Sequence, residues 1–166
     1  VYTSSVATLG LKQDGSSANE DTPSNFTAIA GYYKRTKYLA EQMVKQLTDE
    51  HQLPLIIVNP STPIGPGDIR PTPTGRIVLD TLMGRMPAYV NTGLNIAHVD
   101  DIAYGHLLAY QHGKPGERYI LGGDNMTLLQ ILQTIDEING TQKNRINIPI
   151  GLMLPCLLYT SDAADE

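Results

Sequence analysis

The sequence has 166 residues, of which 41% are apolar and 17% charged, a mixture typical of a folded domain and not of a disordered or collagen-like chain. Twelve basic and seventeen acidic side chains give a net charge of −5, which argues against the broad basic surface of a nucleic-acid-binding domain. No apolar run approaches the ~20 residues that a membrane-spanning helix needs. The single cysteine, Cys156, excludes an internal disulfide and a cysteine-based zinc cluster, and it fits a cytoplasmic protein.

Both ends of the sequence differ from the ends of a complete protein. The chain opens without a methionine on residues 1–5, which already have the pattern of a buried strand, so we interpret the sequence as a fragment. Residues 156–166 (CLLYTSDAADE) break the preceding pattern. We interpret them as a non-native tail translated from a sequencing adapter, with a frayed acidic terminus as the alternative. The folded part is therefore expected over residues 1–155.

Strand and helix patterns alternate through the first half of the chain. Residues 1–5 predict a strand, and residues 11–26, which are rich in Ser, Asn, Asp and Gly, predict a polar loop. Helical spacing then runs over about 28–51. The continuous apolar run at 55–58 predicts a strand that is buried on both faces. Five prolines within residues 59–75 predict a long irregular loop, and such loops are often functional in compact domains.

The alternation continues in the second half of the chain. Short strands are expected at 88–90, 96–99 and 118–121. The pattern also predicts helices at 75–84, at 100–112 with Asp100 as the capping residue, and at 127–139 with Thr127 as the capping residue. This order of elements favours an α/β fold built on a mostly parallel sheet.

Three motifs together indicate an active site, and one of them is the rigid loop at 59–66 (NPSTPIGP) that leaves the second buried strand. Thr3, Ser4 and Ser5 end the first strand, and ligands of open α/β sheets lie beyond the carboxyl ends of strands. Tyr33 and Lys37 form a Tyr-x-x-x-Lys motif, and this spacing puts both side chains on one face of the first helix. An ammonium beside a phenol favours the phenolate, so this tyrosine can act as a general acid or base. The Ser5 hydroxyl could orient the same substrate oxygen.

Each motif also has an ordinary structural interpretation. Tyr-x-x-x-Lys occurs by chance on amphipathic helices with a solvated lysine, and serines after a strand often cap a turn. The segment at 59–66 (NPSTPIGP) could be no more than a rigid loop. The alternative to an enzyme is therefore a non-catalytic α/β scaffold or binding module. The order and spacing of the motifs favour the enzyme, because a scaffold needs none of them.

The same segments resemble a known enzyme family. Residues 1–10 (VYTSSVATLG), 31–41 (GYYKRTKYLAE), 58–66 (VNPSTPIGP) and 98–103 (HVDDIA) resemble the extended short-chain dehydrogenase/reductases. Within these, the resemblance is to the NAD-dependent epimerase/dehydratase family, with its sugar-epimerase and dihydroflavonol reductase-like members. It covers residues 1 to about 155.

The resemblance implies a fold, a cofactor and a set of site residues. The fold would be a Rossmann-type doubly wound parallel sheet with a small C-terminal substrate subdomain, and the cofactor would be NAD or NADP. Ser5 would orient the substrate, and Tyr33 would transfer the proton and also contact the cofactor. Lys37 would activate Tyr33 and bind the nicotinamide ribose. The backbone around Pro60 and Ser61 would lie against the nicotinamide. The substrate would be a small molecule with a carbonyl or hydroxyl group, or a sugar, and the full-length parent could form a homodimer.

Three departures from the family pattern are informative. No Gly-x-x-Gly-x-x-Gly fingerprint for pyrophosphate opens a helix after a strand, so we expect the N-terminal dinucleotide-binding half to be missing and this chain alone to be inactive. Thr62 stands where nucleotide-sugar epimerases usually have Asn. Leu94 stands near the position of an arginine that grips the diphosphate, and leucine cannot replace a guanidinium group. These differences favour a smaller and less charged carbonyl substrate.

The histidines raise the separate hypothesis of a metal site. His98, His106 and His112 are spaced by eight and six residues, which does not match a pair of ligands one helical turn apart, and no cysteine assists them. We therefore expect no metal, and we expect His98 to fix the turn into the following helix.

Overall fold

The computed structural model describes residues 1–12, 14–24, 26, 31–149 and 151. The chain divides into two compact units. Unit 1 comprises Val1–Gly65 and Ile96–Gly123, and unit 2 comprises Pro66–Asn95 and Asp124–Glu166. The expected tail at 156–166 lies outside the described residues. No helix within the described ranges is long and apolar enough to cross a membrane.

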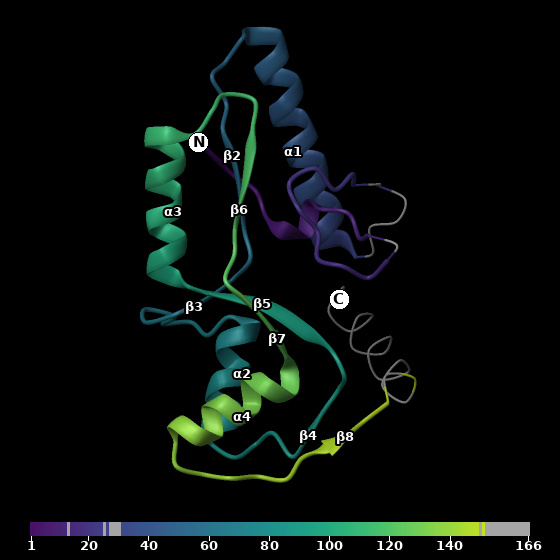
Figure 1. The fold of residues 1–166 in the computed structure, drawn as a ribbon, viewed down its shortest axis with the longest axis vertical. Helices are drawn as coiled ribbons and strands as arrows, with labels where there is room; N and C mark the ends of the chain where they lie inside the picture. The colour runs from purple at the N-terminus through teal and green to yellow at the C-terminus, as the bar shows by residue number, and fades with distance from the viewer. Residues whose placement is uncertain (13, 25, 27–30, 150, 152–166) are drawn as a thin grey trace. The chain divides into compact units, whose positions relative to one another are not determined.

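A parallel sheet of three strands forms the centre of unit 1 (Figure 1). Its strands are β1 (Tyr2–Thr3), β2 (Ile57–Pro60) and β6 (Arg118–Leu121), in the order β1-β2-β6, so β1 and β6 form its two edges. Thr3 pairs with Val58, and Val58 pairs with Tyr119. The sequence predicts that the first two of these strands are parallel neighbours, and the register confirms it.

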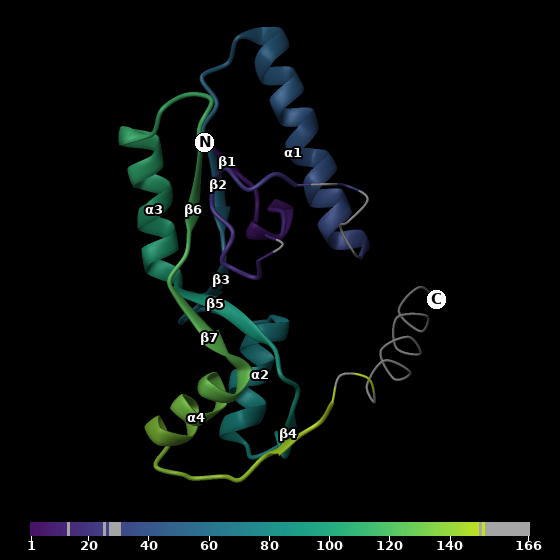
Figure 2. The same cartoon turned by 45° about the vertical axis from the view of Figure 1, so that its right-hand side comes forward.

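Helices cover both faces of this sheet, α1 (Tyr32–His51) on one and α3 (Val99–His112) on the other (Figures 1 and 2). Ile56 and Val58 are buried in a cluster with Ala109 of α3. The alternate residue Asn59 reaches α1 through its side chain, because successive residues of a strand point to opposite faces. The strand predicted at 55–58 is therefore present and buried on both faces, but it lies two residues later, at Ile57–Pro60, and the expected α/β fold class is confirmed.

The segment expected as an irregular loop at 59–75 is partly strand. Its first two residues continue β2, and β3 (Thr62–Ile64) pairs in parallel with the carboxyl end of β5 (Gly93–His98), with Thr62 opposite Ile96. Proline is tolerated in a strand at a sheet edge, where its missing N–H leaves no ladder bond unmade, so Pro63 does not prevent pairing. The proline count alone therefore led to the wrong prediction for these residues.

The first residues of α3 correct another expectation. The helix begins at Val99, and its capping residue is His98, whose Nδ1 accepts a hydrogen bond from the Asp100 backbone N–H at 3.2 Å. Asp100 is therefore not the cap but lies in the first turn with Asp101, where the helix dipole favours acidic side chains. The prediction that His98 fixes this turn is confirmed.

Unit 2 is built from two helices and short strands. The helices α2 (Pro73–Leu82) and α4 (Leu128–Ile138) pack against each other. Thr127 caps α4 as predicted, and Gln130 completes a reciprocal capping box. The strands are β4 (Ala88–Tyr89), β7 (Asp124–Thr127) and β8 (Ile146–Asn147), and β4 and β8 pair in parallel.

A buried ion pair ties α4 to the segments around it in unit 2. Arg145 donates to Asp136 through Nη1 at 2.5 Å and through Nη2 at 3.0 Å, and its Nε donates to the carbonyl of Met86. These bonds from Arg145 hold the pKa of Asp136 below its ordinary value. Both side chains are almost fully buried, so this pair is an internal part of the unit.

Candidate functional site

Ser5 follows β1 and begins the short 3-10 helix η1 (Val6–Thr8). Its hydroxyl accepts a hydrogen bond from the Ala7 N–H at 3.1 Å. Its carbonyl accepts two side-chain bonds, from Thr8 Oγ1 at 2.8 Å and from Asn59 Nδ2 at 2.9 Å. The backbone of Ser5 is thus fixed beside the end of β2, at the carboxyl edge of the sheet, where sequence reasoning expects a ligand.

Tyr33 and Lys37 lie in the first two turns of α1. The Tyr33 side chain is 64% exposed, whereas Lys37 is half-buried. Among the described residues, neither the Tyr33 hydroxyl nor the Lys37 ammonium has a polar partner, so both groups are available to a ligand. The helix packs against η1, which brings the helix next to the segment that Ser5 opens. We predict that the Ser5 hydroxyl, the Tyr33 hydroxyl and the Lys37 ammonium converge on one cleft, and this stays a prediction.

Pro60 and Ser61 stand at the end of β2, as the resemblance requires of residues that face a cofactor. The Ser61 N–H donates to the carbonyl of Leu121 at 2.9 Å, which fixes the strand end against β6. The Ser61 hydroxyl is buried and has no hydrogen-bond partner among the described residues. Because buried polar atoms are nearly always paired in proteins, this hydroxyl fits a site that a polar ligand completes.

Sequence reasoning missed a buried carboxylate at the centre of unit 1. Glu41 of α1 is 1% exposed and accepts hydrogen bonds from Ser4 Oγ at 2.5 Å, Thr8 Oγ1 at 2.8 Å and Asn59 Nδ2 at 3.4 Å. Two cations complete the set, Lys45 with its Nζ at 3.0 Å and Arg118 through Nη2. We call these six residues the Glu41 network.

The Glu41 network keeps its carboxylate ionised. Burial alone would raise the pKa of Glu41, but hydrogen bonds from Ser4, Lys45 and Thr8 and the charge of Arg118 outweigh burial and hold this pKa below its ordinary value. A signal for this residue exists in the sequence, since Glu41 lies four residues after Lys37 and therefore falls on the same helical face.

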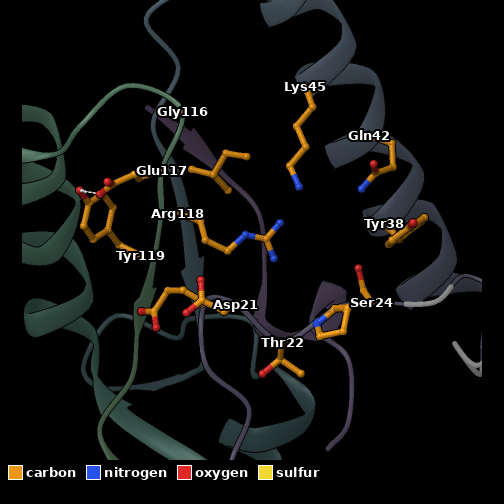
Figure 3. Close-up of a pocket in the computed structure, with 13 residues that line it drawn as sticks. Asp21, Thr22, Ser24, Tyr38, Gln42, Lys45, Gly116, Glu117, Arg118 and Tyr119 are labelled. Carbon is orange, nitrogen blue, oxygen red and sulfur yellow. Dashed lines mark hydrogen bonds between the residues drawn. The ribbon is translucent and has the colours of Figure 1, made fainter.

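An open hollow of about 880 Å³ adjoins the Glu41 network (Figure 3). It lies between α1, β6 and residues 20–24, and Lys45 and Arg118 stand in its wall together with Tyr38 and Gln42. The Glu20 carboxylate accepts a hydrogen bond from the Ile120 N–H at 3.0 Å, which attaches this loop to β6. None of the predicted site residues lines the hollow, so it is separate from the candidate site.

Two of the histidines have structural partners. His98 caps α3, and His106 contacts the Thr3 hydroxyl through Nε2 at 3.0 Å and the Ile102 carbonyl through Nδ1 at 2.8 Å. Within the part of the chain that the structure describes, no group of three or more His, Cys, Asp or Glu side chains could hold a metal ion.

A family pattern and two known proteins match most of this chain. The sequence pattern of the family described as NAD dependent epimerase/dehydratase matches residues 1–122. A protein of Synechocystis sp. named "Putative dihydroflavonol 4-reductase" is 50% identical over 158 residues, which cover 93% of this chain and 46% of that protein. Sterol demethylase protein B of Methylococcus capsulatus is 38% identical over 153 residues, which cover 92% of this chain and 46% of that protein.

A solved structure supports the same relationship. The crystal structure of gox2253 superimposes with a TM-score of 0.88 at 50% sequence identity, and the match covers 99% of this chain and 50% of that one. The chain therefore spans about half the length of the relatives that it matches.

Proposed function

The chain belongs to the NAD dependent epimerase/dehydratase family, and from this premise we propose that it carries the catalytic residues of an NAD(P)-dependent carbonyl reductase. Tyr33 would give its hydroxyl proton to the substrate oxygen, and the Lys37 ammonium would stabilise the phenolate that remains. The Ser5 hydroxyl would hold that oxygen in place. The bound nicotinamide would supply the hydride that reduces the carbonyl carbon.

One observation carries this proposal. Ser5 follows β1 at the same sheet edge where Pro60 and Ser61 end β2, because the two strands are parallel neighbours. Ligands of open α/β sheets lie at this edge, beyond the carboxyl ends of the strands. The helix that bears Tyr33 and Lys37 packs against η1, which starts directly after Ser5.

The residues present fit a nicotinamide cofactor. The buried Ser61 hydroxyl lacks a protein partner in the described chain, and a polar group of the cofactor could pair with it. The half-buried Lys37 ammonium is free to donate to a ribose hydroxyl, as the family resemblance implies. Either NAD or NADP is compatible with these contacts.

A carbonyl substrate is favoured over a nucleotide sugar. Leu94 offers no charge to a diphosphate, and Thr62 stands where nucleotide-sugar epimerases usually have Asn. The relative that is 50% identical carries a dihydroflavonol 4-reductase name, and a dihydroflavonol is an uncharged ketone. Epimerisation of a sugar is the second outcome that the same three residues could support.

The test uses the full-length product of the gene that encodes this chain. Reduction of a dihydroflavonol is followed by the loss of NADH or NADPH absorbance, with a nucleotide-sugar panel in parallel. Tyr33→Phe removes one hydroxyl, so kcat should fall by about 100-fold or more, the lower range for loss of general acid–base catalysis, while cofactor affinity stays unchanged.

Tyr32→Phe is the matched control, because Tyr32 precedes Tyr33 on the same helix and is 79% exposed. It should leave kcat unchanged. If Tyr33→Phe keeps half of the parent turnover on the best substrate found, Tyr33 is structural and the proposed function fails.

A further inference from the structure

Glu41 has hydrogen-bond and ion-pair partners in four elements of unit 1 and in the segment that follows β1. Ser4 follows β1, Thr8 belongs to η1, Asn59 to β2, Arg118 to β6, and Lys45 to α1 itself. We propose that Glu41 is a positioning residue, whose carboxylate fixes the segment around Ser5 against the helix that bears Tyr33 and Lys37. This inference rests on the proposed function.

Three donors of Glu41 also hold Ser5. Ser4 precedes Ser5 in the chain, and its hydroxyl donates to Glu41 at 2.5 Å. Thr8 Oγ1 and Asn59 Nδ2 contact both the Ser5 carbonyl and the Glu41 carboxylate. A shift of the carboxylate therefore reaches Ser5 through side chains that bond to both.

The other side of the link is the helix. Glu41 lies four residues after Lys37 and eight after Tyr33, so the three share one face of α1, with a rotation of about 40° per step. Because a helix is rigid over two turns, fixing Glu41 fixes the rotation and the axial position of the turns that carry Tyr33 and Lys37. The buried Glu41 carboxylate thus fixes the position of Ser5 relative to Tyr33.

The charge balance explains why a carboxylate is needed. Arg118 is 14% exposed and Lys45 is 39% exposed, and both form ion pairs with Glu41. A glutamine has one acceptor oxygen in place of two and no charge, so Arg118 would lose the negative charge with which it pairs. A buried ion pair is by itself weak grounds for stability, and we therefore assign the geometric role to this one.

The test compares Glu41→Gln with Asp136→Asn in the full-length gene product. Asp136 is a matched control, since it is also a buried carboxylate paired with an arginine, but in unit 2. Misplacement of reacting groups by 1 Å can cost about 100-fold, so Glu41→Gln should lower kcat for dihydroflavonol reduction by about tenfold or more. Asp136→Asn should lower Tm and leave kcat unchanged at a temperature where both variants are folded.

Two further variants guard against simple loss of folding. Ser4→Ala removes one bond of the Glu41 network and should lower kcat in a folded protein, by less than Glu41→Gln does. In a Ser5→Ala background, Glu41→Gln should cost less than in the parent, because part of its effect acts through Ser5.

The positioning role is overturned if Glu41→Gln and Asp136→Asn change kcat equally at equal loss of Tm. It would also be overturned if Glu41→Gln lowered kcat by the same factor in the Ser5→Ala background as in the parent. Tyr33→Phe in the same assay separates the two proposals. If Tyr33→Phe is inactive while Glu41→Gln behaves as the control, only the positioning role fails. If Tyr33→Phe is active, both proposals fail together.

Discussion

At the scale of single residues, Lys37 differs from Tyr33 because two roles are proposed for its ammonium. Lys37→Met should lower kcat, since the phenolate of Tyr33 loses the cation proposed to stabilise it. It should also weaken cofactor binding, since the ribose loses a donor. Tyr33→Phe should change kcat alone. Fluorescence titration with NADPH or NADH, together with steady-state kinetics on the full-length gene product, separates the two effects.

Lys34→Met is the control for this comparison, because Lys34 is exposed on the same helix and is not one of the proposed site residues. Ser5→Ala should be milder than either change, since water can partly replace an orienting hydroxyl. An unchanged cofactor affinity in Lys37→Met would remove the ribose contact from the proposal and leave only the role toward Tyr33.

Whether a site residue can be recognised from the sequence depends on how far along the chain its interaction partners lie. Tyr33 and Lys37 stand out because their relation is local, four residues apart on one helix. Glu41 and Asn59 were missed because their partners are distant in sequence, at positions such as Ser4 and Arg118, and a lone glutamate on a helix is usually solvated. Only the parallel order of β1, β2 and β6 brings these groups together.

At the scale of elements, we expect the Glu41 network to make the stability of the packing of α1 on the sheet dependent on pH. The pKa of Glu41 in the folded state lies below the ordinary value of 4.5. Its contribution to stability is therefore complete above that value and is lost as the pH falls through the folded-state pKa, because the unfolded chain then binds the proton more readily.

Glu41→Gln should remove that dependence. At neutral pH the variant should be less stable by about 3 kcal/mol or more, the usual cost of removing one partner from a buried ion pair. Below pH 4 the free energies of unfolding of variant and parent should approach each other, since Glu41 of the parent takes up a proton and loses its negative charge. Urea denaturation between pH 7 and pH 3 measures both effects, and parallel curves would contradict the assignment.

The elements that sequence patterns predicted are those with strong periodicity. The helices and the buried strand β2 were expected close to their observed bounds. The strands β3, β7 and β8 were not, because they are two to four residues long and are polar or contain proline. Such strands form because they pair with a strand that is distant in the sequence, and no local pattern encodes that pairing.

At the scale of the whole molecule, the absent phosphate fingerprint governs cofactor binding. A nicotinamide is proposed to bind at the described sheet edge, but the sequence has no Gly-x-x-Gly-x-x-Gly fingerprint whose backbone N–H groups would hold the pyrophosphate. The chain of 166 residues should therefore bind NADH and NADPH too weakly to detect at micromolar concentrations. Titration calorimetry on this chain, beside the full-length gene product, tests the expectation, and micromolar affinity of the chain would refute it.

The position of β1 at the edge of its sheet has a consequence for how copies of this chain behave in concentrated solution. Tyr2 and Ser4 direct their N–H groups to β2, so the alternate residue Thr3 turns its backbone N–H and carbonyl away from the sheet. Unpaired edge groups are a template for strand addition, and we expect self-association that rises with concentration. Thr3→Pro removes the outward donor without touching a bond to β2, whereas Thr3→Val removes only the hydroxyl. Light scattering over a dilution series should show less association for the proline variant alone, which would make this single backbone N–H the point at which solubility can be adjusted.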